Sequence, residues 1–155
     1  MSRIIILENL PICLNFGIVC IILVIMFWIT KEGRQLGMDL EKLYGTIGSD
    51  YHAVCERFCG HERLIEKFVR SFVGDMTFCN LAAAAERFDY LEIERQAHTL
   101  KGVAGNLGFD RLYRACDILV SSIRFGQLDE VPENFQKVGT EYGMVCDTVK
   151  DLMEN

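Results

Sequence analysis

The spacing of apolar residues constrains this chain more than any other feature, because from residue 38 onward they recur at steps of three and four positions. That period is typical of amphipathic α-helices, and no stretch shows the alternation of a half-buried β-strand. In residues 111–124, for example, the apolar positions are Leu112, Ala115, Cys116, Leu119 and Ile123. Short connections between such helices favour antiparallel neighbours in a bundle. The sequence therefore predicts an all-α fold.

Residues that favour helix ends divide this part of the chain into separate helices. Ser49 or Asp50 can cap one helix, and Asp89 with Glu92 three residues later resembles a capping box that opens another. A break is expected at Gly74. The helices expected from these signals span residues 39–45, 50–59, 61–73, 76–88, 89–107, 111–124 and 133–153, with a loop over 127–132.

Two of these helices carry distinct apolar faces. The helix over 61–73 is expected to carry Leu64, Ile65, Phe68 and Phe72 on one face. The last helix repeats apolar residues in heptad-like steps at Phe135, Val138, Tyr142, Val145, Val149 and Leu152. Four consecutive alanines, Ala82 to Ala85, permit close packing of the helix over 76–88 against a neighbour.

The N-terminal region differs in composition from the rest of the chain. Residues 9–30 contain no charged side chain, and residues 12–29 are almost wholly apolar. About 20 helical residues at ~1.5 Å each span a hydrocarbon core of about 30 Å. We therefore expect a transmembrane anchor over 1–30, a linker over 31–37 and a helical domain over 38–155.

Basic residues suggest which side of the membrane the domain occupies. Lys31 and Arg34 follow the apolar run, which favours a cytoplasmic C-terminal domain, tethered to the inner face of the cell membrane by residues 10–30. The alternative is that Met38 is the true first residue of a soluble protein. The anchor is the favoured interpretation.

Composition argues against several classes of function. The formal net charge is -6, and no run of lysine or arginine is present, which disfavours nucleic acid as a partner. The seven cysteines, an odd number, are scattered and are interpreted as reduced thiols. A zinc site is a weaker alternative for the local cluster His52, Cys55, Cys59 and His61. No glycine-rich phosphate-binding loop is present, so ATP-dependent kinase activity is not expected.

The helix expected over 89–107 carries the most informative residues. His98, Lys101, Gly102 and Gly105 stand at i, i+3, i+4 and i+7, so they share one face, and Glu94 joins it one turn earlier. An apolar stripe occupies the other side, at Ile93, Ala97, Leu100, Ala104 and Leu107. The helix is therefore amphipathic, and His98 is expected to point to water.

The chemistry of this face suits a transient phosphoryl carrier. Two glycines in a helix interior cost roughly 1 kcal/mol each relative to alanine, so helix stability did not select them. Without side chains at Gly102 and Gly105, another protein can approach His98 closely. Imidazole titrates near about pH 6.5, so an unprotonated ring nitrogen is available as a nucleophile at neutral pH. Lys101 could offset the charge of a phosphorylated ring.

The residues around His98 resemble the histidine-containing phosphotransfer (HPt) domain of two-component phosphorelays. The family pattern, His-x-x-Lys-Gly with a further glycine ten positions after the histidine, is present as His98, Lys101, Gly102 and Gly108. Gly108 also suits a helix C-cap. The resemblance implies an antiparallel four-helix bundle with extra short helices. It covers about residues 38–154.

The resemblance also implies a function. His98 would accept a phosphoryl group, on Nε2 in this family, from the phospho-aspartate of a receiver domain and pass it to another receiver. The expected partners are response-regulator receiver domains and a hybrid sensor histidine kinase. The receiver would supply Mg²⁺, so no cofactor is expected here. Two alternatives remain: a docking module that sequesters receivers without carrying phosphate, and a membrane-anchored helical scaffold.

Overall fold

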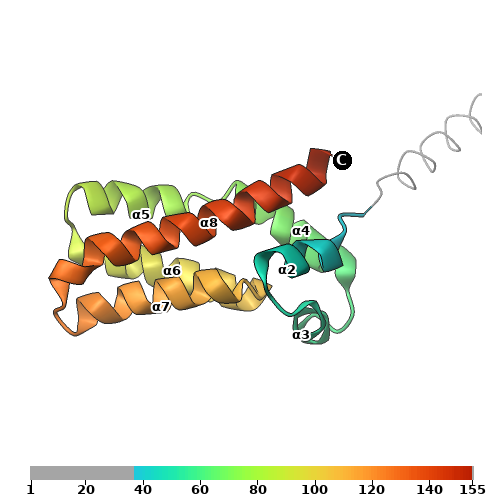
Figure 1. Cartoon of the computed structure of the whole chain (residues 1–155), viewed down its shortest axis with the longest axis horizontal. Helices are drawn as coiled ribbons and strands as arrows, with labels where there is room; N and C mark the ends of the chain where they lie inside the picture. Colours follow the sequence, from blue (N-terminus) through green and yellow to red (C-terminus); the bar gives the residue numbers. More distant parts are fainter. Residues whose placement is uncertain (1–36, 155) are drawn as a thin grey trace, which may run out of the picture. The chain divides into compact units, whose positions relative to one another are not determined.

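The computed structural model describes residues 37–154, which form helices and turns without a β-strand (Figure 1). This confirms the expected all-α fold for the described part, all of which belongs to one compact unit. The elements are α2 (Leu40–Ile47), α3 (Tyr51–Arg57), α4 (Glu62–Val73), α5 (Thr77–Glu86), α6 (Tyr90–Leu107), α7 (Asp110–Arg124), the 3-10 helix η1 (Leu128–Glu130) and α8 (Val131–Glu154).

The expected transmembrane helix over 12–29 lies outside the described residues. Within residues 37–154, no helix combines the length and the apolar character needed to cross a membrane.

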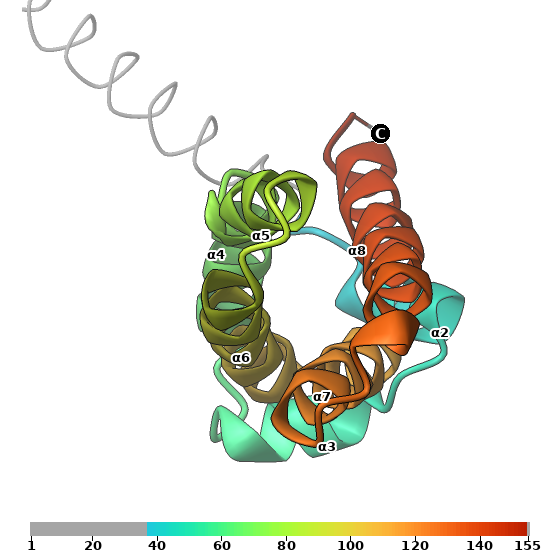
Figure 2. The ribbon, with the colours of Figure 1, turned by 90° about the vertical axis from the view of Figure 1, so that its left-hand side faces the viewer.

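The long helices stand around a common core, as the view along the bundle shows (Figure 2). Helix α6 packs against α5 and α7, and α7 packs against α8. Helices α4 and α5 follow one another along one side and both contact α8. The break between them falls at Gly74, as expected, and the Asp75 carboxylate accepts a hydrogen bond from Thr77 N at 2.7 Å. This arrangement is consistent with an HPt-like helical bundle.

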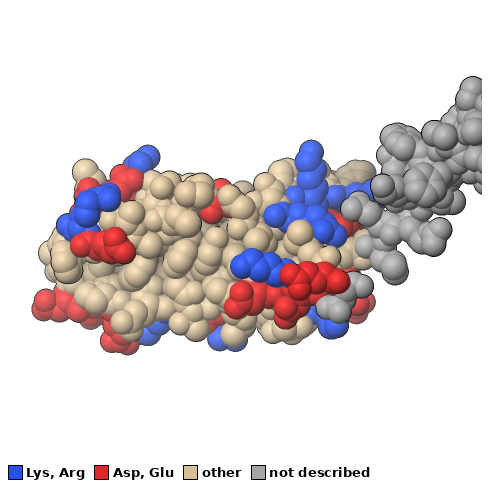
Figure 3. All heavy atoms as spheres, turned by 90° about the horizontal axis from the view of Figure 1, so that it is seen from above, with Lys and Arg blue, Asp and Glu red and all other residues tan. Residues whose placement is uncertain are grey.

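Aromatic rings pack against one another between α5 and α8. Phe78 on α5 stacks on Tyr142 of α8 with ring centroids 4.2 Å apart, and it also lies parallel to Phe135. Tyr142 in turn contacts the buried Phe72 of α4. On the face shown in Figure 3, charged side chains gather toward the two ends, and the middle is mostly free of them.

Two local details differ from the sequence pattern. The apolar face of α4 is divided: Ile65, Val69 and Phe72 are buried, whereas Leu64 and Phe68 are exposed by 40% and 45%. The buried residues of α4 follow one another at steps of four and three positions and form a stripe that faces the core. Leu64 and Phe68 each precede a residue of that stripe and therefore lie beside it. The loop expected over 127–132 instead contains η1 and the start of α8, because proline is tolerated in the first turn of a helix.

Candidate functional site

His98 lies on the exposed side of α6, in the middle of the 18-residue helix. The apolar stripe predicted for the opposite side is confirmed, since Ile93, Ala97, Leu100, Ala104 and Leu107 are each at most 4% exposed. Burial of that stripe against the core fixes the rotation of α6 about its axis. The imidazole is therefore held toward solvent by the packing of its own helix.

The two ends of α6 are both capped. At the N-terminal end, the Asp89 side chain accepts a hydrogen bond from Glu92 N at 3.1 Å, which confirms Asp89 as the N-cap. The reciprocal half of the expected capping box is not formed, because the Glu92 carboxylate accepts from Arg95 and Gln96, and Asp89 N donates to Ala84 O. At the other end, Gly108 has a left-handed backbone with φ 70°, which confirms it as the C-cap. A Cβ at Gly108 would stand 2.2 Å from Cγ2 of Val54, so α3 also packs directly against this glycine.

The carbonyls at the C-terminal end of α6 are bound by residues from α2 and α3. Tyr44 Oη donates to Leu107 O at 2.7 Å, and Arg57 Nη1 donates to Gly105 O at 2.6 Å and to Asn106 O at 2.8 Å. Burial raises the pKa of Tyr44, so its phenol keeps the proton that it donates. These bonds satisfy carbonyls that a helix end leaves without partners. No local sequence signal identifies Tyr44 or Arg57.

The two glycines beside His98 have different surroundings. Among the described residues, no atom beyond the local helix backbone lies within 4 Å of where a Cβ would stand at Gly102. At Gly105 a Cβ would come within 3.1 Å of the Tyr113 ring on α7. Gly102 therefore leaves open space next to His98, whereas the absence of a side chain at Gly105 allows α6 and α7 to approach closely.

Two ion pairs cross from the His98 face of α6 to α7. Lys101 Nζ lies 3.0 Å from Oδ1 of Asp117 and 6.0 Å from the centroid of the Tyr113 ring. On the other side of His98, Glu94 Oε1 lies 2.6 Å from Nε of Arg124. The sequence identified Lys101 and Glu94 but missed Asp117 and Arg124, because helical spacing within α6 does not reveal its neighbours on α7.

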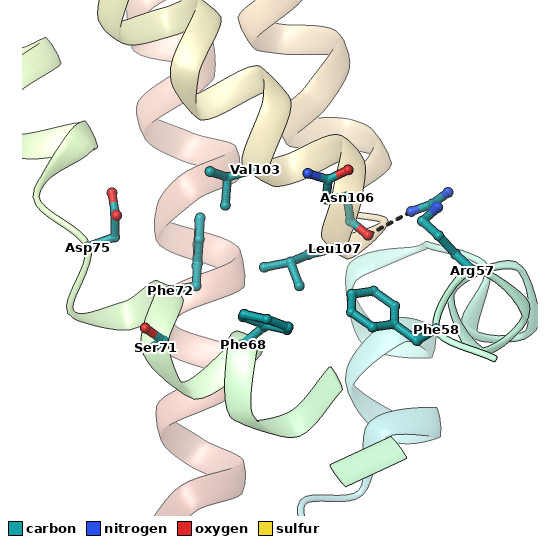
Figure 4. Close-up of a pocket in the computed structure, with 9 residues that line it drawn as sticks. All are labelled: Arg57, Phe58, Phe68, Ser71, Phe72, Asp75, Val103, Asn106 and Leu107. Carbon is teal, nitrogen blue, oxygen red and sulfur yellow. Dashed lines mark hydrogen bonds between the residues drawn. The ribbon is translucent and has the colours of Figure 1, made fainter. Parts of the chain in front are cut away.

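A pocket lies beside the C-terminal half of α6 (Figure 4). Its volume is about 440 Å³. Phe58, which follows α3, and Phe68 and Phe72 of α4 face Val103 and Leu107 of α6 across it. The exposure of Phe68, which belongs to the apolar face expected on α4, is explained by its position in this wall.

The cysteines and histidines show no metal site in the described part. Across residues 37–154, no group of three or more His, Cys, Asp or Glu side chains could hold a metal ion. Cys59 and Cys79 are exposed free thiols, whereas Cys116 is buried. Burial raises the pKa of the Cys116 thiol to about 12, and the nearby charge of Lys101 acts in the opposite direction.

Comparison with known families identifies the class of this bundle. A model of the Hpt domain matches residues 63–155, more than half of the 155-residue chain, so the chain belongs to the Hpt domain family. The match begins within α4 and thus excludes α2 and α3. Searches of curated proteins and of solved structures found no match.

Membership of this family implies a histidine phosphotransfer role in a phosphorelay. Hpt domains are phosphoryl carriers rather than kinases, and they interact with receiver domains and histidine kinases.

Proposed function

We propose that this chain is a phosphorelay intermediate in which His98 accepts a phosphoryl group from the phospho-aspartate of one receiver domain and passes it to another. The observation that carries the assignment is that His98 is the one histidine in the residues that match the Hpt domain, and it is exposed. His52 and His61 are exposed as well, but both precede residue 63.

The proposed transfer needs only a nucleophile from this chain. The unprotonated ring nitrogen of His98 attacks phosphorus, the P–O bond to the aspartate breaks, and its electron pair leaves with the aspartate carboxylate. The reverse sequence of bond changes delivers the group to the next receiver. Magnesium would be supplied by the receiver, which also provides the acidic pocket, so this chain needs no cofactor of its own.

The neighbours of His98 have distinct proposed roles. Lys101 offsets part of the negative charge of the phosphorylated ring. Gly102 leaves room for the receiver to approach the imidazole, and Gly105 and Glu94 extend the docking face along α6. Gly108 holds the end of the helix in place through its left-handed backbone.

The cellular setting is also a proposal. We infer that the helical domain faces the cytoplasm, where receiver domains and a hybrid sensor kinase are its partners, and that residues 10–30 tether it to the membrane. Fractionation of cells that express the chain with a C-terminal tag tests the tether. A wholly soluble product would rule it out.

The central experiment is incubation of the purified chain with a phosphorylated receiver domain from the same cell, followed by detection of acid-labile, base-stable phosphate on the chain. The variants are His98→Gln and, as a matched control, His52→Gln, which removes another exposed histidine. We expect label on the wild type and on His52→Gln, and none on His98→Gln.

Binding to the receiver separates the alternatives. If His98→Gln still binds the receiver with unchanged affinity, the lost label reflects lost chemistry rather than lost docking. A wild type that binds receivers and takes no label would be a docking module. A folded wild type that binds no receiver would overturn the proposal and favour a helical scaffold.

A further inference from the structure

The cation next to His98 is bound to an acidic residue of another helix. The Lys101 ammonium lies 3.0 Å from the Asp117 carboxylate, and the Lys101 side chain is 18% exposed while that of Asp117 is 51% exposed. The Tyr113 ring, 6.0 Å from the ammonium, adds a second contact on α7. Asp117 and Tyr113 stand one turn apart and hold the charge of Lys101 toward α7.

Phosphorylation of His98 changes the electrostatic balance at this position. A phosphoryl group brings roughly two negative charges to a site one helical turn from Lys101. Asp117 then acts against the phosphorylated state in two ways, because it competes for the ammonium and because its own carboxylate repels the added negative charge.

We propose that Asp117 is a positioning residue that restrains Lys101 and thereby keeps phosphorylated His98 weakly stabilised, so that the phosphoryl group passes on to the next aspartate. This inference rests on the proposed function of His98. The ion pair is partly exposed, so Asp117→Asn should change the equilibrium by roughly two- to fivefold, which lies in the upper part of the range typical of such pairs.

The first measurement is the partition of phosphate between the full chain and a receiver domain at equilibrium. Asp117→Asn should shift it roughly two- to fivefold toward His98, and Asp117→Glu should restore the wild-type value. Glu141→Gln is the matched control: it also removes one negative charge from an ion pair, but that pair, with Arg111 at 2.8 Å, joins α7 to α8. It should leave the partition unchanged.

A double-mutant cycle tests whether Asp117 acts through Lys101. In a Lys101→Ala background, Asp117→Asn should have a much smaller effect on the partition, because no ammonium remains to be released. An undiminished effect would overturn the positioning role and leave only direct repulsion. An Asp117→Asn partition equal to that of Glu141→Gln, or shifted toward the receiver, would overturn the inference entirely.

A donor that needs no receiver separates this inference from the proposed relay. Phosphoramidate can phosphorylate an imidazole directly, with cleavage of its P–N bond and departure of ammonia. In the Asp117→Asn variant, we expect the rate of His98 phosphorylation by this reagent to be roughly two- to fivefold higher than in the wild type at low salt. The difference should be smaller at high salt. If phosphoramidate phosphorylates Asp117→Asn faster than the wild type, but no receiver transfers phosphate to the chain, the proposed relay is rejected and the role of Asp117 is retained. Failure to load His98 at all would reject both.

Discussion

The two ends of α6 are stabilised in different ways. At the N-terminal end, Asp89 caps a backbone N–H three residues away in the same segment. At the C-terminal end, Tyr44 and Arg57 reach the last carbonyls from 63 and 48 residues earlier in the chain. The side-chain cap of the N-terminal end therefore comes from local sequence, whereas the C-terminal end combines the local cap at Gly108 with hydrogen bonds that depend on the packing of α2 and α3 against the bundle.

This difference has a consequence for the limits of the domain. The Hpt match begins at residue 63, yet Tyr44 and Arg57 lie before it and bind the helix that carries His98. Tyr44 is completely buried and stacks near Phe109, the residue that follows the Gly108 cap. The two short helices are thus part of the same core, and the position of the His98 helix depends on them.

The largest effect is expected from removing the Tyr44 ring. Tyr44→Ala should lower the free energy of unfolding by about 3–5 kcal/mol, because it empties a fully buried aromatic site. Tyr44→Phe keeps the ring and loses only the hydrogen bond to Leu107 O, so about 1–3 kcal/mol is expected. Urea unfolding measures both values. Equal losses would mean that the ring contributes nothing beyond its hydroxyl group.

The next effect concerns the glycine at the same end. Gly108→Ala places a side chain on a left-handed backbone, at a cost of about 1–2 kcal/mol, and forces Val54 to move, which adds about 1–3 kcal/mol. Gly126→Ala is the matched control, because Gly126 has φ 72° and, within the described residues, open space around its Cβ position. Thermal unfolding should show a clearly larger loss for Gly108→Ala. If the two variants lost equal stability, Val54 and α3 would move aside at no measurable cost in free energy.

The contrast between the ends also explains what the sequence could predict. Asp89, Gly108 and the buried stripe of α6 follow from spacing within one helix, and all were predicted correctly. Tyr44, Arg57 and Asp117 could not be found in this way. Their partners lie on another helix, α6, and the packing of the helices decides which side chains meet. Periodicity also failed to separate Phe68 from its buried neighbours in α4, since the pocket wall and the core lie on adjacent sides of that helix.

The same contrast applies to the residues around His98. The pattern of His98, Lys101 and Gly102 predicted an exposed nucleophile with a cation nearby, and its exposure is observed. The pattern did not predict that Lys101 is paired with α7 or that Gly105 lies against Tyr113. Helical spacing thus identifies a chemical group, whereas the neighbouring helix determines how much of its charge is available.

The smallest effect is expected at the local end of α6. Asp89→Ala removes the side-chain acceptor for Glu92 N and should lower the free energy of unfolding by about 1 kcal/mol, whereas Asp89→Ser should retain most of the cap. Because Asp89 and Tyr44 act at opposite ends of the 18-residue helix and bind different backbone groups, the losses from Asp89→Ala and Tyr44→Phe should add to within about 0.5 kcal/mol in urea unfolding. Arg57→Ala and Tyr44→Phe act on adjacent carbonyls of one helix end, so their losses should not add. If Asp89 and Tyr44 were coupled as strongly as Arg57 and Tyr44, the two ends of the helix would not be independent, and the distinction between local and tertiary capping would fail.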